Sequence, residues 1–249
     1  MKRFDDTEDP RRRVLVQALT SWIAALGIPG GPALAASVLG SAPSLLSPNK
    51  SIYRLNGTVT VNGIPATMDT RILPGDTVQT GKDSEIVFVV GGSALILRAE
   101  SNLTLDPAPK DAPSAVASLI SGLRLLTGKL LSVHGKGRPV RMQTVVATIG
   151  IRGTGVYMES DPEQSYICTC YGVTDIAAIN DKESKETVSA THHDRPLYIL
   201  AKAQPGNSIR GAPFINHTDQ ELMLIETLVG RTPPFVFPGN QYNAPRRDY

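Results

Sequence analysis

The stretch SEIVFVVGGSALIL, residues 84–97, decides the fold class of this chain. Apolar residues occupy alternate positions on both sides of the pair Gly91-Gly92, as Ile86 and Phe88 illustrate. Alternation with a period of two places these side chains on one face of a strand, and glycines permit a tight turn between two strands. The stretch therefore predicts a β-hairpin with one face in a hydrophobic core.

Similar β patterns continue outward from this hairpin. Asn56-Gly57 and Asn62-Gly63 are pairs that typically form tight turns between antiparallel strands. Short runs of apolar and β-branched residues recur from Ser51 to Ala203, separated by turn-forming residues. We therefore expect a mainly β fold over this range.

Two segments have the apolar spacing of an α-helix instead. Residues 114–126 place apolar side chains three and four positions apart, and residues 218–229 do the same. Thr218 and Glu221 have the spacing of a capping box, which marks the start of a helix. The sequence thus predicts one short helix inside the β region and one amphipathic helix near the C-terminus.

Composition and motifs narrow the classes of function. The chain has 249 residues and a formal net charge of +2, so it lacks the strongly basic character of a nucleic-acid-binding protein. It contains no G-x-S-x-G and no H-E-x-x-H motif, and no carboxylate pair stands in a shared strand. We therefore expect a protein that is not an enzyme and does not bind nucleic acid.

The N-terminus has the pattern of an export signal. Residues 1–35 contain a charged flank, a short apolar run and the small residues Ala33-Leu34-Ala35 in that order. Arg11-Arg12 makes the signal similar to a twin-arginine signal, and the alternatives are Sec export or an uncleaved membrane anchor. We expect a periplasmic mature chain without a membrane span, and residues 36–50 have the composition of a linker.

Three motifs resemble those of the FecR-domain family. They are a Gly-Asp-x-Val-x-Thr-Gly opening, a Ser-x-Leu-x-Leu strand at 101–105 and an Arg-Gly-Thr turn, within about residues 70–180. The residues of the opening and of the turn that match are Gly75, Asp76, Thr80, Gly81, Arg152, Gly153 and Thr154. We expect their glycines to supply tight turns rather than a phosphate-binding loop.

The resemblance implies a solenoid-like all-β module at 51–180, located in the bacterial envelope, followed by a C-terminal extension at 181–249. The best-known members of this family regulate iron-uptake genes and carry a sigma-factor-binding segment before a membrane helix. Only 13 residues precede the apolar run here, so we expect no such segment. The resemblance therefore implies a sensory or binding module with an envelope protein as partner.

The stretch SYICTCYG, residues 165–172, contains both cysteines of the chain. On a strand, Tyr166, Cys168 and Cys170 point to the same face, with Cα atoms of successive members about 6.6 Å apart. That separation is near the upper limit for a disulfide, and so small a loop would stabilise the fold little. Inert buried thiols, a metal site and a redox-active pair are the other interpretations.

Three of the four histidines follow the cysteines. We hypothesise that Cys168 and Cys170 bind a soft metal ion (zinc, copper or iron) together with His217 and either His192 or His193. Adjacent residues of a strand point to opposite faces, so one of the latter two should face away. The alternative is a structural or protein-interaction module with inert cysteines.

The fourth histidine, His134, lies in a glycine-rich and basic stretch, VHGKGRPVR. This composition is typical of a hairpin tip in solvent. We therefore expect His134 to be exposed and to take no part in the metal site.

Overall fold

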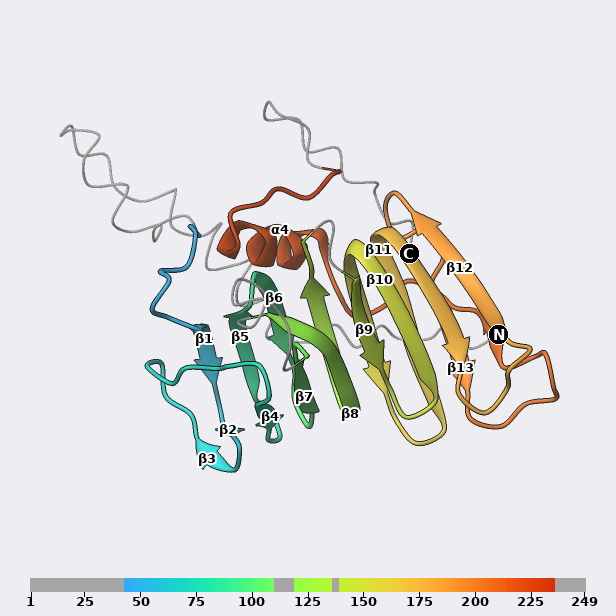
Figure 1. Cartoon of the computed structure of the whole chain (residues 1–249), viewed down its shortest axis with the longest axis horizontal. Helices are drawn as coiled ribbons and strands as arrows, with labels where there is room; N and C mark the ends of the chain where they lie inside the picture. Colours follow the sequence, from blue (N-terminus) through green and yellow to red (C-terminus); the bar gives the residue numbers. More distant parts are fainter. Residues whose placement is uncertain (1–42, 110–118, 136–138, 236–249) are drawn as a thin grey trace, which may run out of the picture. The chain divides into compact units, whose positions relative to one another are not determined.

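The computed structural model describes residues 43–109, 119–135 and 139–235, which contain fourteen β-strands and one α-helix. The strands are β1 (Ile52–Asn56), β2 (Val59–Val61), β3 (Ile64–Pro65), β4 (Thr77–Thr80), β5 (Glu85–Val90), β6 (Ser93–Leu97), β7 (Asn102–Pro107), β8 (Ile120–Val133), β9 (Pro139–Gln143), β10 (Ala147–Ser160), β11 (Gln164–Ala178), β12 (Lys185–Ala190), β13 (Leu197–Leu200) and β14 (Ile209–Gly211), and the helix is α4 (Asp219–Leu228) (Figure 1). The mainly β fold class is confirmed. The export signal expected at 1–35 lies outside the described residues.

All fourteen strands belong to one sheet. Its longest path runs β14-β13-β11-β10-β9-β8-β7-β4-β2-β3. A branch leads from β8 through β6 and β5 to β1, and β12 pairs with β11. Neighbours are antiparallel except for β8 and β9, which are parallel. The strands of the C-terminal extension, β12 to β14, thus continue the sheet formed by residues 52–178.

Three long strands, β8, β10 and β11, each change pairing partners along their length. β8 pairs with β7 and β9 before Gly128, and with β6 and β10 from Gly128 onward. β10 likewise exchanges β9 for β8 around Gly153, where its pairing with β11 contains bulges. β11 pairs with β13 in its first part and with β12 from Gly172 onward.

The three glycines at these exchanges have positive φ angles, of 92° at Gly128, 60° at Gly153 and 90° at Gly172. Glycine adopts this backbone region without the steric cost that a Cβ imposes. A Cβ on Gly172 would also lie 2.4 Å from Cγ2 of Thr154. Bulges and glycines bend strands, so these positions let each long strand pair with different partners before and after the bend. Gly153 therefore acts inside β10, and not in a turn between strands as expected.

Strands along the whole sheet contribute residues to a first core. Phe88 of β5 and Leu95 of β6 are opposite each other in the register and fully buried, which confirms the hairpin at 84–97. The first core includes the buried residues Val78, Ile86, Phe88, Leu95, Leu97, Leu103, Leu123, Leu130, Ile149, Val156, Met158 and Ile167. Buried hydroxyl groups on this side of the sheet pair with each other, as Ser165 does with Thr144 and Thr169 with Thr174, both at 2.7 Å.

A second core lies on the opposite face of the same central strands. Since side chains alternate along a strand, the neighbours of first-core residues point there. Its buried members are Val87, Ala94, Ile96, Leu131, Val133, Tyr157, Tyr166, Cys168, Cys170, Tyr171, Leu222, Ile225 and Leu228. The last three belong to α4, which lies beside β6 and β8 (Figure 1). The helix therefore closes the second core.

The C-terminal helix was predicted at 218–229 and is found at 219–228. Thr218 is its N-cap, and both halves of the capping box with Glu221 are present. Leu222, Ile225 and Leu228 form its buried face. Within the described residues, no helix combines the length and hydropathy that a membrane span requires.

The helix predicted at 114–126 is wrong where it can be checked. Residues 114–118 lie outside the described residues, and residues 120–126 form the first part of β8. Leu123 and Leu125 are fully buried while Leu126 is exposed, which is the period of a strand. The apolar residues here fit both periods, and pairing with β7 and β9 selected the strand.

The expectation of an exposed His134 is also wrong. This side chain is buried directly after β8, with Ser93 Oγ 3.0 Å from Nδ1 and Ser132 Oγ 3.0 Å from Nε2. Burial, assisted by the positive charge of Arg231, lowers the pKa of His134 to about 3. His134 is therefore a neutral histidine that is hydrogen-bonded within the fold.

Candidate metal centre

Strand β11 places both cysteines on the second core. Cys168 and Cys170 are fully buried, lie two residues apart and share their face with Tyr166, as the spacing predicts. Tyr157 of β10 is opposite Cys168 in the register. Both cysteines are free thiols and form no disulfide. The strand thus directs two sulfur atoms to the same side of the sheet.

The turn after β12 positions His193. The carboxylate of Asp194 accepts hydrogen bonds from the backbone N–H and the hydroxyl of Thr191, at 2.6 and 2.9 Å. His193 has a left-handed backbone, with φ of 53°, and its N–H donates to the carbonyl oxygen of Cys170 at 3.0 Å. Its ring Nδ1 lies 3.4 Å from Cys168 Sγ. The turn therefore ties this imidazole to the cysteine strand.

The start of α4 positions His217. Asn216 before it has a φ of 59°, and Thr218 after it caps the helix. The His217 side chain is fully buried, with its ring stacked on Tyr157 at a centroid distance of 4.4 Å. Its Nε2 lies 3.4 Å from Cys170 Sγ and 3.1 Å from Nδ1 of His193. Residues distant in sequence thus meet at one point.

Hydrogen bonds on the outer sides of the two rings fix which nitrogens face inward. His193 Nε2 lies 3.0 Å from a carboxylate oxygen of Asp219, and His217 Nδ1 lies 2.7 Å from the carbonyl oxygen of Ile215. These oxygens only accept, so both outer nitrogens carry hydrogen. In the neutral rings, His193 Nδ1 and His217 Nε2 therefore turn lone pairs towards the sulfurs and each other. Metal-binding imidazoles have this arrangement.

Three of the six separations among the ligand atoms match the edges of a tetrahedral coordination shell. Two Cys Sγ atoms, His193 Nδ1 and His217 Nε2 offer four ligand atoms within 4.8 Å of one another. With bonds of about 2.3 Å to sulfur and about 2.0–2.1 Å to nitrogen, a tetrahedral zinc ion gives edges of about 3.5 Å between sulfur and nitrogen and about 3.3 Å between nitrogens. The corresponding distances here are 3.4, 3.4 and 3.1 Å.

The surroundings act on the two thiols in opposite directions. Burial alone favours the neutral thiol of Cys168, but hydrogen bonds with Cys170, His193 and His217 hold its pKa well below that of an ordinary thiol. Burial and the neighbouring Cys168 sulfur raise the pKa of Cys170 well above the ordinary value. The surroundings therefore favour the thiolate at Cys168 and the thiol at Cys170, and a bound cation would favour the thiolate at both.

The pKa of His193 is raised. Burial opposes protonation of this ring, but hydrogen bonds to Asp219 and Cys168 outweigh that effect. The Cys168 sulfur and the His193 ring therefore each favour the charged form of the other. This interaction involves two of the four ligand atoms, whereas a metal ion would bind all four.

His192 lies outside the set of four. Its Nε2 donates to the same oxygen of Asp219, at 2.9 Å, and its side chain remains partly exposed. The sequence predicted that one of the two adjacent histidines would face away from the thiols. Both residues lie in the turn after β12 rather than on opposite faces of a strand, so the outcome agrees and the reason differs.

Sequence reasoning missed Asp219 and Tyr157, which contact the two histidines from outside. Asp219 is the first residue of α4 and accepts hydrogen bonds from His192 and His193. Acidic residues are favoured in the first turn of any helix, so Asp219 was open to a simpler interpretation. Its position two residues after His217 was the available signal.

The family motif residues stabilise turns and strands elsewhere. Asp76 accepts hydrogen bonds from the Asn62 side chain and the Leu73 N–H, both at 2.7 Å, beside Gly75 with a φ of 100°. The hydroxyl of Thr80 accepts from the Ser101 N–H at 2.9 Å. The remaining members have equally local surroundings: Gly81 donates to the carbonyl of Thr58, Arg152 pairs with Asp175, Gly153 bends β10, and Thr154 is buried beside Gly172.

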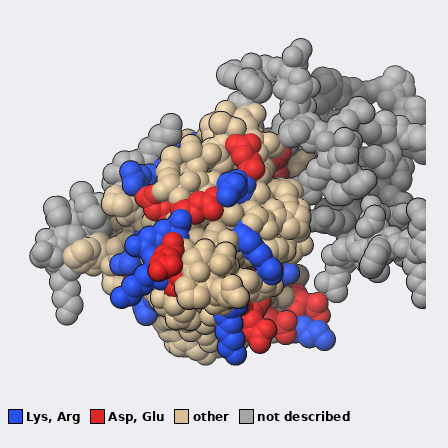
Figure 2. All heavy atoms as spheres, turned by 90° about the vertical axis from the view of Figure 1, so that its right-hand side faces the viewer, with Lys and Arg blue, Asp and Glu red and all other residues tan. Residues whose placement is uncertain are grey.

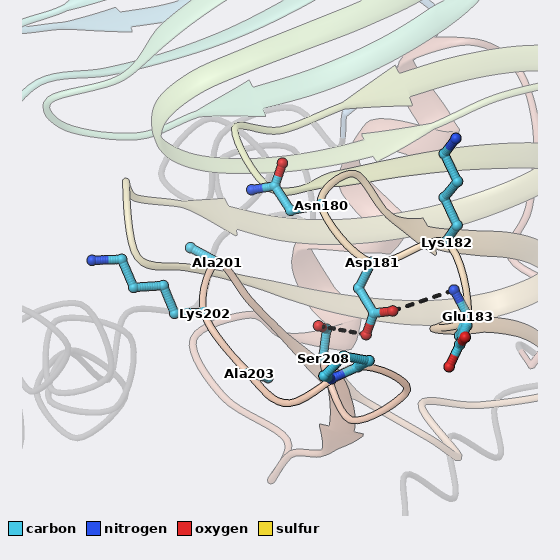
Figure 3. Close-up of a pocket in the computed structure, with 9 residues that line it drawn as sticks. Asn180, Asp181, Lys182, Glu183, Ala201, Lys202, Ala203 and Ser208 are labelled. Atoms are coloured by element: carbon cyan, nitrogen blue, oxygen red, sulfur yellow. Dashed lines mark hydrogen bonds between the residues drawn. The ribbon is translucent and has the colours of Figure 1, made fainter.

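A hollow near the ends of β11 and β13 has a structural explanation (Figure 3). Asp181 accepts a hydrogen bond from Ser208 at 2.8 Å, which Figure 3 draws. It also accepts from Ser184 at 2.6 Å and from the N–H of Gly206 at 2.9 Å. These bonds, that of Ser184 first, lower the pKa of Asp181 to about 2. The carboxylate holds two loops together. The hollow is lined by Asn180, Asp181, Lys182, Glu183, Ala201, Lys202, Ala203, Pro205 and Ser208.

Charged side chains of both signs are interspersed on the face drawn in Figure 2. Ion pairs among the described residues include Arg152 with Asp175 and Arg195 with Glu186. On this face, the described residues form no region of a single sign. This face therefore offers no surface of a single charge sign as a competing candidate site.

No protein-family model and no curated protein matches this chain. Two solved structures of a Parabacteroides distasonis protein, each described as a "putative anti-sigma factor", are similar to it with TM-scores of 0.41 and 0.42 and 12% sequence identity. Each similarity covers 55% of this chain and 58% of the solved chain. The matched region is thus less than two thirds of the solved protein.

Proposed function

We propose that the protein binds one zinc ion through Cys168, Cys170, His193 and His217. The single observation that carries this proposal is the convergence of two sulfur and two imidazole nitrogen atoms within 4.8 Å of one another, with three of their separations at the edge lengths of a tetrahedral site. The oxygen acceptors on the outer nitrogens of both rings support it independently, because they orient the lone pairs inward.

The site has the properties of a structural or regulatory metal centre rather than a catalytic one. Catalytic zinc sites keep one position for water or substrate, whereas structural sites use four protein ligands. Cys168, Cys170 and His217 are buried and the His193 side chain is only 7% exposed, so two thiolates would balance the charge of a divalent ion where unbalanced charge is costly. This favours a binding protein over an enzyme.

The ligand types also rank the metals. Tetrahedral sites with two sulfur and two nitrogen ligands suit zinc, while copper(I) and iron–sulfur clusters favour a higher share of sulfur ligands. A divalent ion leaves the complex neutral, and a monovalent ion would leave one net negative charge in the core. Zinc is therefore the expected occupant, ahead of copper and iron.

We further propose that this centre belongs to an exported module of the bacterial envelope similar to FecR domains. The order of the motifs from Gly75 to Thr154 and the charged, apolar and small-residue order of residues 1–35 support this location. Replacing Arg11 and Arg12 by lysine should retain the protein in the cytoplasm. Unchanged export of that variant would exclude the twin-arginine route, and a cytoplasmic wild-type protein with Met1 retained would exclude export.

Metal analysis of the full chain tests the zinc proposal. Protein purified under reducing, oxygen-free conditions and loaded with zinc should contain one zinc ion per chain by elemental analysis. Cobalt(II) in place of zinc should give the intense visible bands of tetrahedral coordination and a sulfur-to-cobalt charge-transfer band. Loading with copper(I) or iron(II) in parallel shows whether either ion displaces zinc.

Variants separate the site from adventitious binding. Cys168→Ser, Cys170→Ser and His217→Gln should each lose stoichiometric zinc and the cobalt charge-transfer intensity expected of two thiolates. His192→Gln is the matched control, because it changes the adjacent histidine outside the four ligands and should retain one zinc per chain. A wild-type protein that stays metal-free at saturating zinc would sink the proposal and leave the inert-thiol, protein-interaction module as the better description.

A further inference from the structure

A C-terminal cover, defined here as residues 212–231, closes the second core. Leu222, Ile225 and Leu228 of α4 are buried in that core, and Phe214 and Ile215 pack against it. The cover begins where the Ala212 N–H donates to the carbonyl of Pro196 at 2.9 Å. It therefore lies over the face that contains both cysteines.

Polar contacts attach this cover at both ends of α4. At the C-terminal end, the buried carboxylate of Glu226 accepts hydrogen bonds from Tyr171 and from Arg231 Nε, the latter at 2.7 Å. Arg231 also donates to the carbonyl of Gly92 at 3.1 Å. This end contains a balanced ion pair and requires no ion from solution.

At the N-terminal end, two of the proposed ligands, His217 and His193, take part in the contacts that attach the cover to the sheet. His217 reaches β11 through its ring, 3.4 Å from Cys170 Sγ, and Asp219 accepts the hydrogen bond of His193 at 3.0 Å. Without a metal ion, His217 and Cys170 are joined only by the weak hydrogen bond of a thiol. A metal ion bound to both side chains would join them strongly. Arg98 adds an ion pair with Glu221 at 2.6 Å.

The ligands divide between the sheet and the cover. Cys168 and Cys170 belong to β11, and His193 is tied to that strand by its own backbone bond to Cys170 at 3.0 Å. His217 is the ligand that belongs to the cover, and it directly precedes the capping residue Thr218. A bound ion would therefore join the cover to the sheet, and its loss would act first on the N-terminal end of α4.

We propose that zinc occupancy controls whether the N-terminal part of the C-terminal cover stays closed on the cysteine-bearing face of the sheet. The proposal rests on the zinc site proposed above and assigns that site a regulatory role. In the metal-free protein, residues 212–221 lift from the sheet while the Glu226–Arg231 end remains attached. The apolar surface around Tyr157 and Tyr166 then becomes accessible, and the protein reports the availability of zinc as a change of surface.

Hydrogen–deuterium exchange on the full chain, with and without saturating zinc, tests this mechanism. Amides of residues 213–222, among which Pro213 has none, should exchange at least tenfold faster without zinc, while those of β5 and β6 change less than twofold. Equal rates at 213–222 in a protein shown by elemental analysis to bind zinc would overturn the mechanism but not the zinc site. A uniform increase across all strands would also overturn it, because zinc would then hold the whole fold.

Two variants make the test independent of global stability. Cys170→Ser should show the fast exchange at 213–222 whether or not zinc is added. Glu226→Gln retains every ligand, so zinc should still slow exchange at 213–222 while residues 226–231 become faster in both states. If Glu226→Gln abolishes the zinc effect at 213–222, the cover opens as a single body and the proposed division between its two ends is wrong.

Discussion

The two cores of this molecule share the same central strands and differ in what fills them. The first core is formed by apolar side chains, and the buried polar groups on its face of β11 are hydroxyls such as Ser165, which pairs with Thr144 at 2.7 Å. The second core contains both cysteines and three tyrosines, and the buried polar side chains of His217 and Glu226 contact it. The first face is therefore held by packing and neutral hydroxyl pairs, and the second also depends on titratable groups with specific partners.

This difference shows how a β fold gains a chemical site. Apolar side chains can be exchanged for others of similar volume at modest cost, so the first core specifies a shape. A buried polar group destabilises the fold unless it has a partner of suitable geometry. The second core therefore specifies individual contacts, and those contacts converge on Cys168, Cys170, His193 and His217.

The largest expected effect tests whether the first core is independent of the site. Phe88→Ala removes a fully buried ring from the first core, which should lower the free energy of unfolding by about 3–5 kcal/mol. Because Phe88 points away from the cysteine face, the loss should be equal with and without zinc. Urea denaturation under both conditions measures it, and a zinc-dependent loss would show that the two cores are coupled.

A second effect concerns the buried histidine beside the cover. The pKa of His134 is about 3 in the folded protein, because of burial and Arg231, and about 6.5 when unfolded. Below pH 6.5 the unfolded chain binds a proton at His134 and the folded chain does not. The free energy of unfolding therefore has its full value above pH 6.5 and falls as the pH is lowered towards 3. The expected slope is about 1.4 kcal/mol per pH unit.

The matched variant for this pH effect is His134→Gln, which retains a side chain able to bond to Ser93 and Ser132. Denaturation curves give the free energy of unfolding at each pH. Between pH 7 and pH 4 it should fall less steeply for the variant than for the wild type, by about 1.4 kcal/mol per pH unit, the slope that one proton contributes. Parallel curves would mean that His134 is protonated in the folded state, and the buried, neutral assignment would then be wrong.

The smallest effect addresses the attachment of the cover. Thr218→Ala removes the N-cap of α4 and should lower the free energy of unfolding by about 1 kcal/mol. Urea denaturation followed by circular dichroism measures the change. Thr227→Ala is the control, because Thr227 lies inside the same helix and is not its N-cap. An unchanged stability for Thr218→Ala would indicate that the cover is already detached in the reference protein.

Much of the fold was predictable because its signals are local. The alternation at 84–97 and the capping box at Thr218 each depend on neighbouring residues, and both features are confirmed. The placement of Cys168 and Cys170 on one face follows from the same geometry of a strand. Pattern alone failed at 120–126, where apolar spacing fits a helix and a strand equally and the partner strands decided.

By itself, the sequence determined a mainly β chain with a capped C-terminal helix, two thiols on one strand face and histidines after them. Only the tertiary structure decided that His193 rather than His192 joins the thiols, that Asp219 supports it, and that His134 is buried. The physical reason is range: side-chain periodicity acts over a few residues, whereas the second core joins residues 25 to 47 positions apart along the chain. Their meeting depends on how the sheet bends and where the cover closes.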